Sequence, residues 1–102
     1  MAAFHFLPTT HPTITTATWT KVNAKSHSSG YACLILNEDA TATFRFEVVA
    51  NGETVPTTAA HGTKLVAGQG YQWDYDGLLL GDLYVYQASG GSLATLAVRE
   101  EA

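Results

Sequence analysis

Few side chains in this sequence have the types and the spacing that chemistry requires. The four histidines are scattered along the chain: His5, His11, His27 and His61. The closest two are six residues apart, whereas zinc sites use closely spaced pairs. Ser26 and His27 are neighbours, so on an extended chain their side chains point in opposite directions and form no nucleophile–base pair. We therefore expect no enzymatic activity and no metal or other cofactor.

The acidic residues that follow residue 73 match a calcium loop only in part. An EF-hand loop starting at Asp74 needs an oxygen ligand at its fifth position, glycine at its sixth and glutamate at its twelfth. Those positions hold Leu78, Leu79 and Val85 instead. Asp-Gly and Gly-Asp pairs are typical of turns, so we interpret residues 76–82 as a loop between strands.

Charge is sparse in this chain of 102 residues, of which 14% are charged and 46% hydrophobic, with a net charge of -4. Ordinary soluble domains carry roughly 25% charged residues. The basic residues are spread singly, which argues against a nucleic-acid partner, because phosphate binding needs clustered Lys and Arg. We also expect no membrane partner and no signal peptide. Cys33 stands alone in an apolar run and is expected to be a buried residue of a cytoplasmically made chain.

Aromatic residues are the most informative group. Tyr71, Trp73 and Tyr75 alternate along one predicted strand, and Tyr84 and Tyr86 alternate along the next. If these two strands pair around the intervening loop, the five rings form one patch. Tyrosine and tryptophan combine an apolar body with a polar tip, so the patch has three interpretations. The patch belongs to the core, forms a protein–protein interface or serves as a platform for carbohydrate.

Two apolar segments predict an interface. Residues 1–12 form a proline-containing arm, and because this arm carries Phe4, Phe6 and Leu7 we expect it to dock on its own domain or on a neighbour. The second segment is a run of three leucines: Leu78, Leu79 and Leu80. Three consecutive leucines cannot all face one core from a strand, so at least one is exposed or lies in an interface.

From residue 13 onward, short apolar segments alternate with turn signals. We predict strands over residues 13–22, 31–36, 41–49, 53–55, 64–66, 71–75, 83–88 and 93–99. The run 31–36 is mostly apolar, as expected of a strand covered on both faces. In residues 41–49, Phe44, Phe46 and Val48 alternate with Thr43, Arg45 and Glu47, which predicts a strand with one buried face. Asn51-Gly52 predicts a tight hairpin from 41–49 into 53–55, and Gly90-Gly91 predicts another from 83–88 into 93–99.

Seven or eight strands at this spacing are typical of sandwiches and barrels. We therefore predict an all-β fold, an antiparallel β-sandwich or jelly-roll-like domain over residues 13–102 with an extended arm at 1–12. A domain of this size has a small core, so oligomerisation would add stability.

The residue pattern of several segments is similar to that of a known class of proteins. These segments are TWTKV at residues 18–22, ACLILN at 32–37, GTKLVAG at 62–68, LYVYQASGG at 83–91 and LAVRE at 96–100. Over most of residues 18–100 the chain resembles the small β-sandwich virion proteins of tailed bacteriophages, which decorate capsids or build tail parts. The resemblance implies a non-enzymatic structural protein that is made in the host cytoplasm and located in the virion. It also implies self-association, which we expect as a trimer or higher ring, contact with other virion proteins and no cofactor. The alternative is a carbohydrate-binding or host-receptor-binding β-sandwich module that uses the five aromatic residues named above.

Overall fold

The structure is a computed structural model that describes residues 5–14, 17–24, 30–50, 53–58, 61–74, 77–90 and 94–102. These residues contain no helix. They contain seven strands: β1 (Thr20–Lys21), β2 (Cys33–Asn37), β3 (Thr43–Val49), β4 (Thr63–Leu65), β5 (Gly70–Trp73), β6 (Asp82–Ser89) and β7 (Leu96–Glu100).

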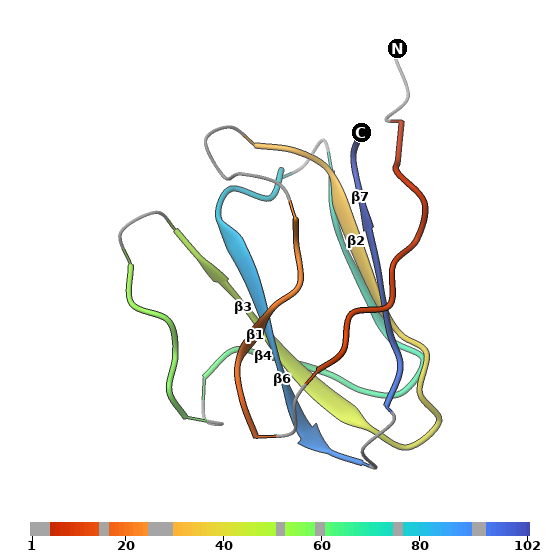
Figure 1. Cartoon of the computed structure of the whole chain (residues 1–102), viewed down its shortest axis with the longest axis vertical. Coiled ribbons are helices and arrows are strands. Elements are labelled where there is room, and N and C mark those ends of the chain that lie inside the picture. Colours follow the sequence, from red (N-terminus) through yellow and green to blue (C-terminus); the bar gives the residue numbers. More distant parts are fainter. Residues whose placement is uncertain are drawn as a thin grey trace.

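The strands form two antiparallel sheets that confirm the predicted β-sandwich (Figure 1). The strand order is β1-β6-β3-β4 in one sheet and β5-β2-β7 in the other. Of the connections between successive strands, only that from β3 to β4 stays within one sheet. The hairpin predicted from 83–88 into 93–99 is therefore wrong, because β6 and β7 lie in different sheets.

The alternation predicted for residues 41–49 is confirmed in β3. Phe44 and Phe46 are buried, whereas Arg45 and Glu47 lie half-buried on the outer face of the sheet. Successive side chains of a strand point to opposite faces, so this pattern places one side of β3 against the other sheet. β6 alternates in the same way and pairs with β3 from Val49↔Asp82 to Phe44↔Gln87.

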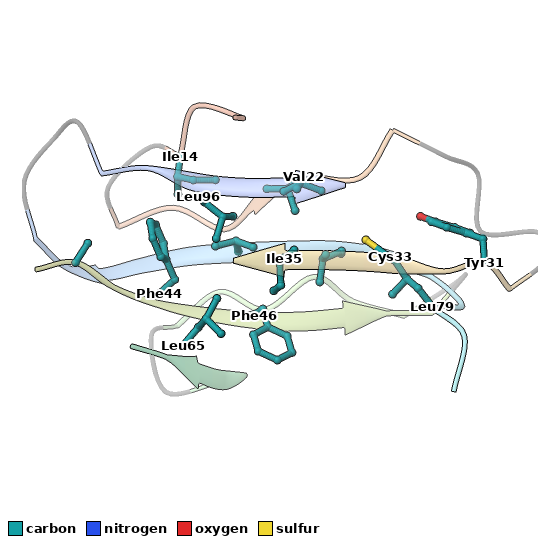
Figure 2. Packing of buried hydrophobic residues seen from close by; sticks show 14 residues of the cluster. Ile14, Val22, Tyr31, Cys33, Ile35, Phe44, Phe46, Leu65, Leu79 and Leu96 are labelled. Carbon is teal, nitrogen blue, oxygen red and sulfur yellow. The ribbon is translucent and has the colours of Figure 1, made fainter. Parts of the chain in front are cut away.

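The core lies between the two sheets. Side chains from both of them meet in one cluster, including Ile35 of β2, Phe44 of β3 and Leu96 of β7 (Figure 2). Cys33 belongs to this cluster and has no exposed area, in agreement with its expected role as a small buried residue. Burying these apolar side chains is the main favourable contribution to folding.

Residues 5–10 of the arm run beside β7, where they extend the three-stranded sheet (Figure 1). The backbone N–H of Leu7 donates to the Glu100 carbonyl at 2.8 Å. Thr10 and Val98 exchange two backbone hydrogen bonds of 2.8 and 2.9 Å. Of the two docking sites expected for the arm, the structure has it on its own domain, where it covers the edge of β7.

Two predicted strands differ from the structure. Among the described residues of 13–22, only Thr20 and Lys21 form a strand, β1, because Ala17 adopts a left-handed φ of 62° that interrupts an extended chain. Residues 53–55 form no strand, although the Glu53 N–H donates to the Ala50 carbonyl at 2.9 Å. β4 takes the place beside β3 instead, through the pair Phe46↔Thr63. Asn51 and Gly52 lie outside the described residues.

Candidate interaction surface

The leucine triplet is divided between core and surface. Leu79 has no exposed area, and its backbone N–H donates to the Tyr31 carbonyl at 2.8 Å. Leu78 and Leu80 are 44% and 58% exposed. Because neighbours on an extended segment point to opposite sides, anchoring Leu79 turns both flanking side chains outward. The prediction of Leu79 as an interface residue is therefore corrected to a core role, while Leu78 and Leu80 form an exposed leucine pair.

The arm residues also differ among themselves. Phe4 lies outside the described residues. Phe6 is half-buried, with the Arg99 guanidinium carbon 5.6 Å from its ring centroid, a cation–π arrangement. Leu7 is 46% exposed even though its backbone is paired with Glu100. Of the two described residues of the predicted arm interface, Leu7 is thus the more exposed.

The single five-ring aromatic patch does not form. β5 pairs with β2 through Cys33↔Trp73 and Ile35↔Tyr71, so Tyr71 and Trp73 lie in the three-stranded sheet. Tyr84 and Tyr86 lie on β6 in the other sheet. The condition for the patch, pairing of residues 71–75 with 83–87, is not met, because β5 and β6 lie in different sheets.

Two smaller aromatic groups take its place. Tyr71 and Trp73 contact each other and Phe46 of the opposite sheet, with ring centroids 4.8 to 5.6 Å apart. Phe46 is buried and Trp73 half-buried, whereas Tyr71 is 46% exposed. These three rings therefore close one side of the sandwich, and Tyr71 presents part of its ring to solvent. Tyr75 lies outside the described residues.

The second group joins β1 to the long β3–β4 connection. Trp19 packs on Tyr86 at a centroid distance of 5.4 Å, and its indole N–H donates to the Thr58 carbonyl at 3.0 Å. Arg45 adds a hydrogen bond from Nη1 to the Gly62 carbonyl at 3.2 Å. Trp19 is buried, so these contacts hold the connection against the outer face of the four-stranded sheet.

Titratable side chains are dispersed over the described surface. His11 Nε2 lies 2.8 Å from Glu38 Oε1, both groups being well exposed. A hollow of about 440 Å³ beside the β3–β4 connection has Glu47, Glu53 and His61 in its lining. Nowhere in the described ranges do three or more His, Cys, Asp or Glu side chains come together in a way that could hold a metal ion.

Buried polar groups gather at one end of the core, where they lie on the segment after β1, on the segment before β2 and on β7. Asn23 Nδ2 donates to the Tyr31 hydroxyl at 2.6 Å, and the Glu100 carboxylate accepts the Ala24 N–H at 2.9 Å. Burial raises the pKa of Tyr31 to about 12. Burial, assisted by the nearby Glu100 carboxylate, also raises the pKa of the Cys33 thiol to about 12. Cys33 therefore remains a protonated, shielded thiol at neutral pH.

Two asparagines, Asn23 and Asn37, are buried although the sequence does not indicate it. Asn37 donates from Nδ2 to the carbonyls of Ala42 and Leu65, and Asn23 accepts the Leu83 N–H at 2.8 Å. Asn37 precedes Glu-Asp, and Asn23 follows the predicted strand 13–22. Asparagine at such positions is a common turn residue, so the sequence indicates a loop at both places. No local signal distinguishes an asparagine that satisfies buried backbone groups.

Comparison of the chain with protein-family models, with curated proteins and with solved structures gives no match. The described ranges include no helix with the length and apolar character needed to cross a bilayer.

Proposed function

We propose that this chain is a non-enzymatic structural subunit that associates with itself and docks on a larger protein surface. The proposal is carried by the exposed leucine pair, Leu78 and Leu80. Their loop is fixed to the core by Leu79, so the two side chains stand in water at a defined position. Single exposed apolar residues are normal, but two on one short anchored loop favour a contact surface.

Leu78 is further constrained by Gly30. A Cβ atom added to Gly30 would lie 2.9 Å from Leu78 Cβ, so the leucine packs directly against the glycine backbone. Ordering before association reduces the conformational entropy lost on binding. The leucine pair therefore has the two properties of a docking site, an apolar surface and a fixed geometry.

We propose that this larger surface belongs to a phage particle, because the sequence resembles virion proteins of tailed bacteriophages. In this role the chain is made in the host cytoplasm and incorporated into the virion, as a capsid decoration or a tail component. Its partners are other copies, in a trimer or higher ring, and the neighbouring virion proteins. Sparse charge supports the proposal, because a surface that is covered in an assembly needs few charges to remain in solution.

Sedimentation of the intact chain at micromolar concentration tests the proposal. We expect species larger than a monomer, and we expect Leu80→Lys to shift them toward the monomer while the thermal unfolding curve is unchanged. Thr63→Lys, at an exposed position of the edge strand β4, is the matched control. A wild-type chain that stays monomeric up to millimolar concentration would contradict self-association.

A carbohydrate-binding role is supported by one observation, the half-exposed ring of Tyr71 backed by Trp73 at 4.8 Å. Sugars stack on such rings. A glycan array with wild type and Tyr71→Ala tests this role. Binding that depends on Tyr71 while the oligomer is unchanged would favour it over the structural role.

A further inference from the structure

Residues 5–14 form a discrete unit on the edge of the three-stranded sheet (Figure 1). At the start of this unit, the His5 carbonyl accepts the N–H of Ala102, two residues beyond β7, at 2.6 Å. At its other end Ile14 is buried and belongs to the core cluster (Figure 2). Ile14 lines a hollow of about 190 Å³ together with Leu96, the first residue of β7. The unit therefore meets β7 or its flanking residues at both ends, with Ile14 as an apolar anchor.

Side-chain contacts add to this backbone pairing. The Arg99 guanidinium lies 5.6 Å from the Phe6 ring centroid, and its Nε–H donates to the Leu7 carbonyl at 2.9 Å. His11 Nε2 lies 2.8 Å from Glu38 Oε1. Arg99 lies on β7 and Glu38 directly follows β2, so the sheet that the unit extends also supplies these contacts. The resulting surface fits an arm of this sequence, whichever copy of the chain supplies it.

The residues that follow the arm belong to the other sheet. Lys21 of β1 pairs with Tyr84 of β6, and Trp19 packs on Tyr86. Since β1 and β7 lie in different sheets, the chain passes from one sheet to the other between Ile14 and Trp19. One short connection therefore joins the arm to the rest of the domain, with buried contacts on both sides of it.

That connection contains a strained residue. Ala17 has a φ of 62°, and within the described ranges it is the one non-glycine residue with a positive φ. At such a φ the Cβ atom crowds the carbonyl oxygen that follows it, and an extended backbone avoids this contact. The connection can extend only if the arm leaves its own β7, so the strain at Ala17 favours release of the arm. Short connections under strain are the ones at which chains exchange segments.

We infer that the arm exchanges between copies of this chain. Residues 5–14 of one copy occupy the β7 edge of a second copy, and the connection at Ala17 extends. The contacts of the arm are the same in the closed and the exchanged form, so the two forms differ in the connection and in the translational freedom lost on association. Arms passed from each copy to the next close a ring, in agreement with the trimer or higher ring expected from the resemblance. The inference rests on the proposed self-association and names one of its contacts.

The prolines of the arm assist the exchange. Pro8 and Pro12 have a fixed φ, and they restrict Leu7 and His11, the residues before them, to extended conformations. A released arm therefore stays close to the conformation that it adopts on β7, and less conformational entropy is lost when it binds a second copy. The vacated edge of β7 presents unpaired backbone groups, which are a template for an incoming strand.

Substitutions of Ala17 test the role of strain, with sedimentation at micromolar concentration as the measurement. Ala17→Gly removes the Cβ atom and relieves the closed connection. We expect this variant to weaken association by roughly tenfold or more, because at least two connections are relieved in each assembly. Ala17→Val places a β-branched residue at a positive φ, which disfavours the closed connection further and should strengthen association. Ala67→Gly, at an exposed position of the β4–β5 connection, is the control and should associate like wild type.

A mixed disulfide tests directly which copy's β7 the arm occupies. Phe6 and Glu101 are bridge partners, so cysteines at these two positions come within disulfide reach. The variants Phe6→Cys and Glu101→Cys are refolded together and oxidised with glutathione disulfide, and we expect a disulfide that joins the two different chains. Cys33 is buried and does not compete. Phe6→Cys refolded with Lys64→Cys, an exposed position of β4, is the control and should give no such product.

Unfolding curves are measured for every variant, because Phe6→Cys also removes the contact with Arg99. The inference is wrong if the mixed disulfide does not exceed the control, or if both Ala17 variants associate like wild type. In either case, association of wild type that is lost in Leu80→Lys would leave the proposed function standing. If wild type is monomeric up to millimolar concentration and no mixed disulfide forms, the proposed function fails together with the inference.

Discussion

Asn37 and Leu65 connect the two sheets through a buried hydrogen bond of 3.1 Å, in which the asparagine side chain donates to the leucine carbonyl. Asn37 belongs to β2 and Leu65 to β4, so the bond crosses the sandwich. The same Nδ2 donates to the Ala42 carbonyl at 2.8 Å, and Oδ1 accepts the Asp39 N–H at 3.0 Å. This side chain therefore satisfies backbone groups that the core would otherwise bury unpaired.

Replacing Asn37 by leucine should destabilise the fold strongly. The substitution retains side-chain volume but removes the donor to two buried carbonyls, which we expect to cost about 2–4 kcal/mol. Chemical denaturation measures the loss. Gln72→Leu, an exposed amide on the neighbouring strand β5, is the matched control and should change stability by less than about 0.5 kcal/mol. Equal effects of the two substitutions would contradict a bridging role for Asn37.

Trp19 should contribute through packing more than through its hydrogen bond. Trp19→Phe removes the indole donor to Thr58 but keeps a ring on Tyr86, so a loss of about 1 kcal/mol is expected. Trp19→Ala also removes the buried ring and should cost about 3–5 kcal/mol. Urea unfolding monitored by circular dichroism separates the two values. The interpretation fails if the alanine variant is as stable as the phenylalanine variant.

Gly62 and Gly68 allow backbone strain to be separated from steric overlap. Both have a left-handed φ, 85° and 77°, so alanine at either position costs about 1–2 kcal/mol in backbone strain. A Cβ at Gly62 would also lie 2.6 Å from the Phe46 carbonyl oxygen, whereas at Gly68 it meets nothing within 4 Å. Gly62→Ala should therefore destabilise the fold clearly more than Gly68→Ala in thermal unfolding. The reverse order would show that the connection does not pack closely on β3.

Alkaline pH should destabilise the folded chain. Cys33 and Tyr31 have ordinary pKa values of 9.0 and 10.0, and burial raises both to about 12 in the folded state. Between the unfolded-state and the folded-state pKa values, the unfolded chain binds fewer protons than the folded one. The free energy of unfolding therefore falls as pH rises from about 9 to about 12. Denaturation midpoints across this range measure the slope. Cys33→Ala should reduce the slope, and an unchanged slope would mean that the thiol does not contribute.

Local pattern was enough to predict much of the fold. The alternation around Phe44 and Phe46 predicted the buried face of β3, because side-chain direction in a strand depends only on position along the chain. The apolar context of Cys33 likewise predicted its burial. Three consecutive leucines predicted that at least one of them is exposed or lies in an interface, and the exposed fractions of Leu78 and Leu80 agree.

The candidate surfaces were harder to predict because they depend on which strands become neighbours. Tyr71 and Tyr86 belong to strands that follow each other in sequence, yet they lie in different sheets. The neighbours of Leu36 are Gly70 and Ala97, and they are known only once β5 and β7 are placed on either side of β2. Neither relationship has a signal in the residues of one segment.

The sequence by itself determined that this chain is an all-β domain with sparse charge, a buried cysteine and apolar segments beyond the needs of its core. These properties follow from composition and from the two-residue period of a strand. Only the tertiary structure decided that Leu79 is core, that Asn37 bridges the sheets and that the two aromatic strands lie in different sheets. Those outcomes depend on contacts between residues distant in sequence, which form when connections cross between the sheets, and local backbone preferences do not specify such crossings.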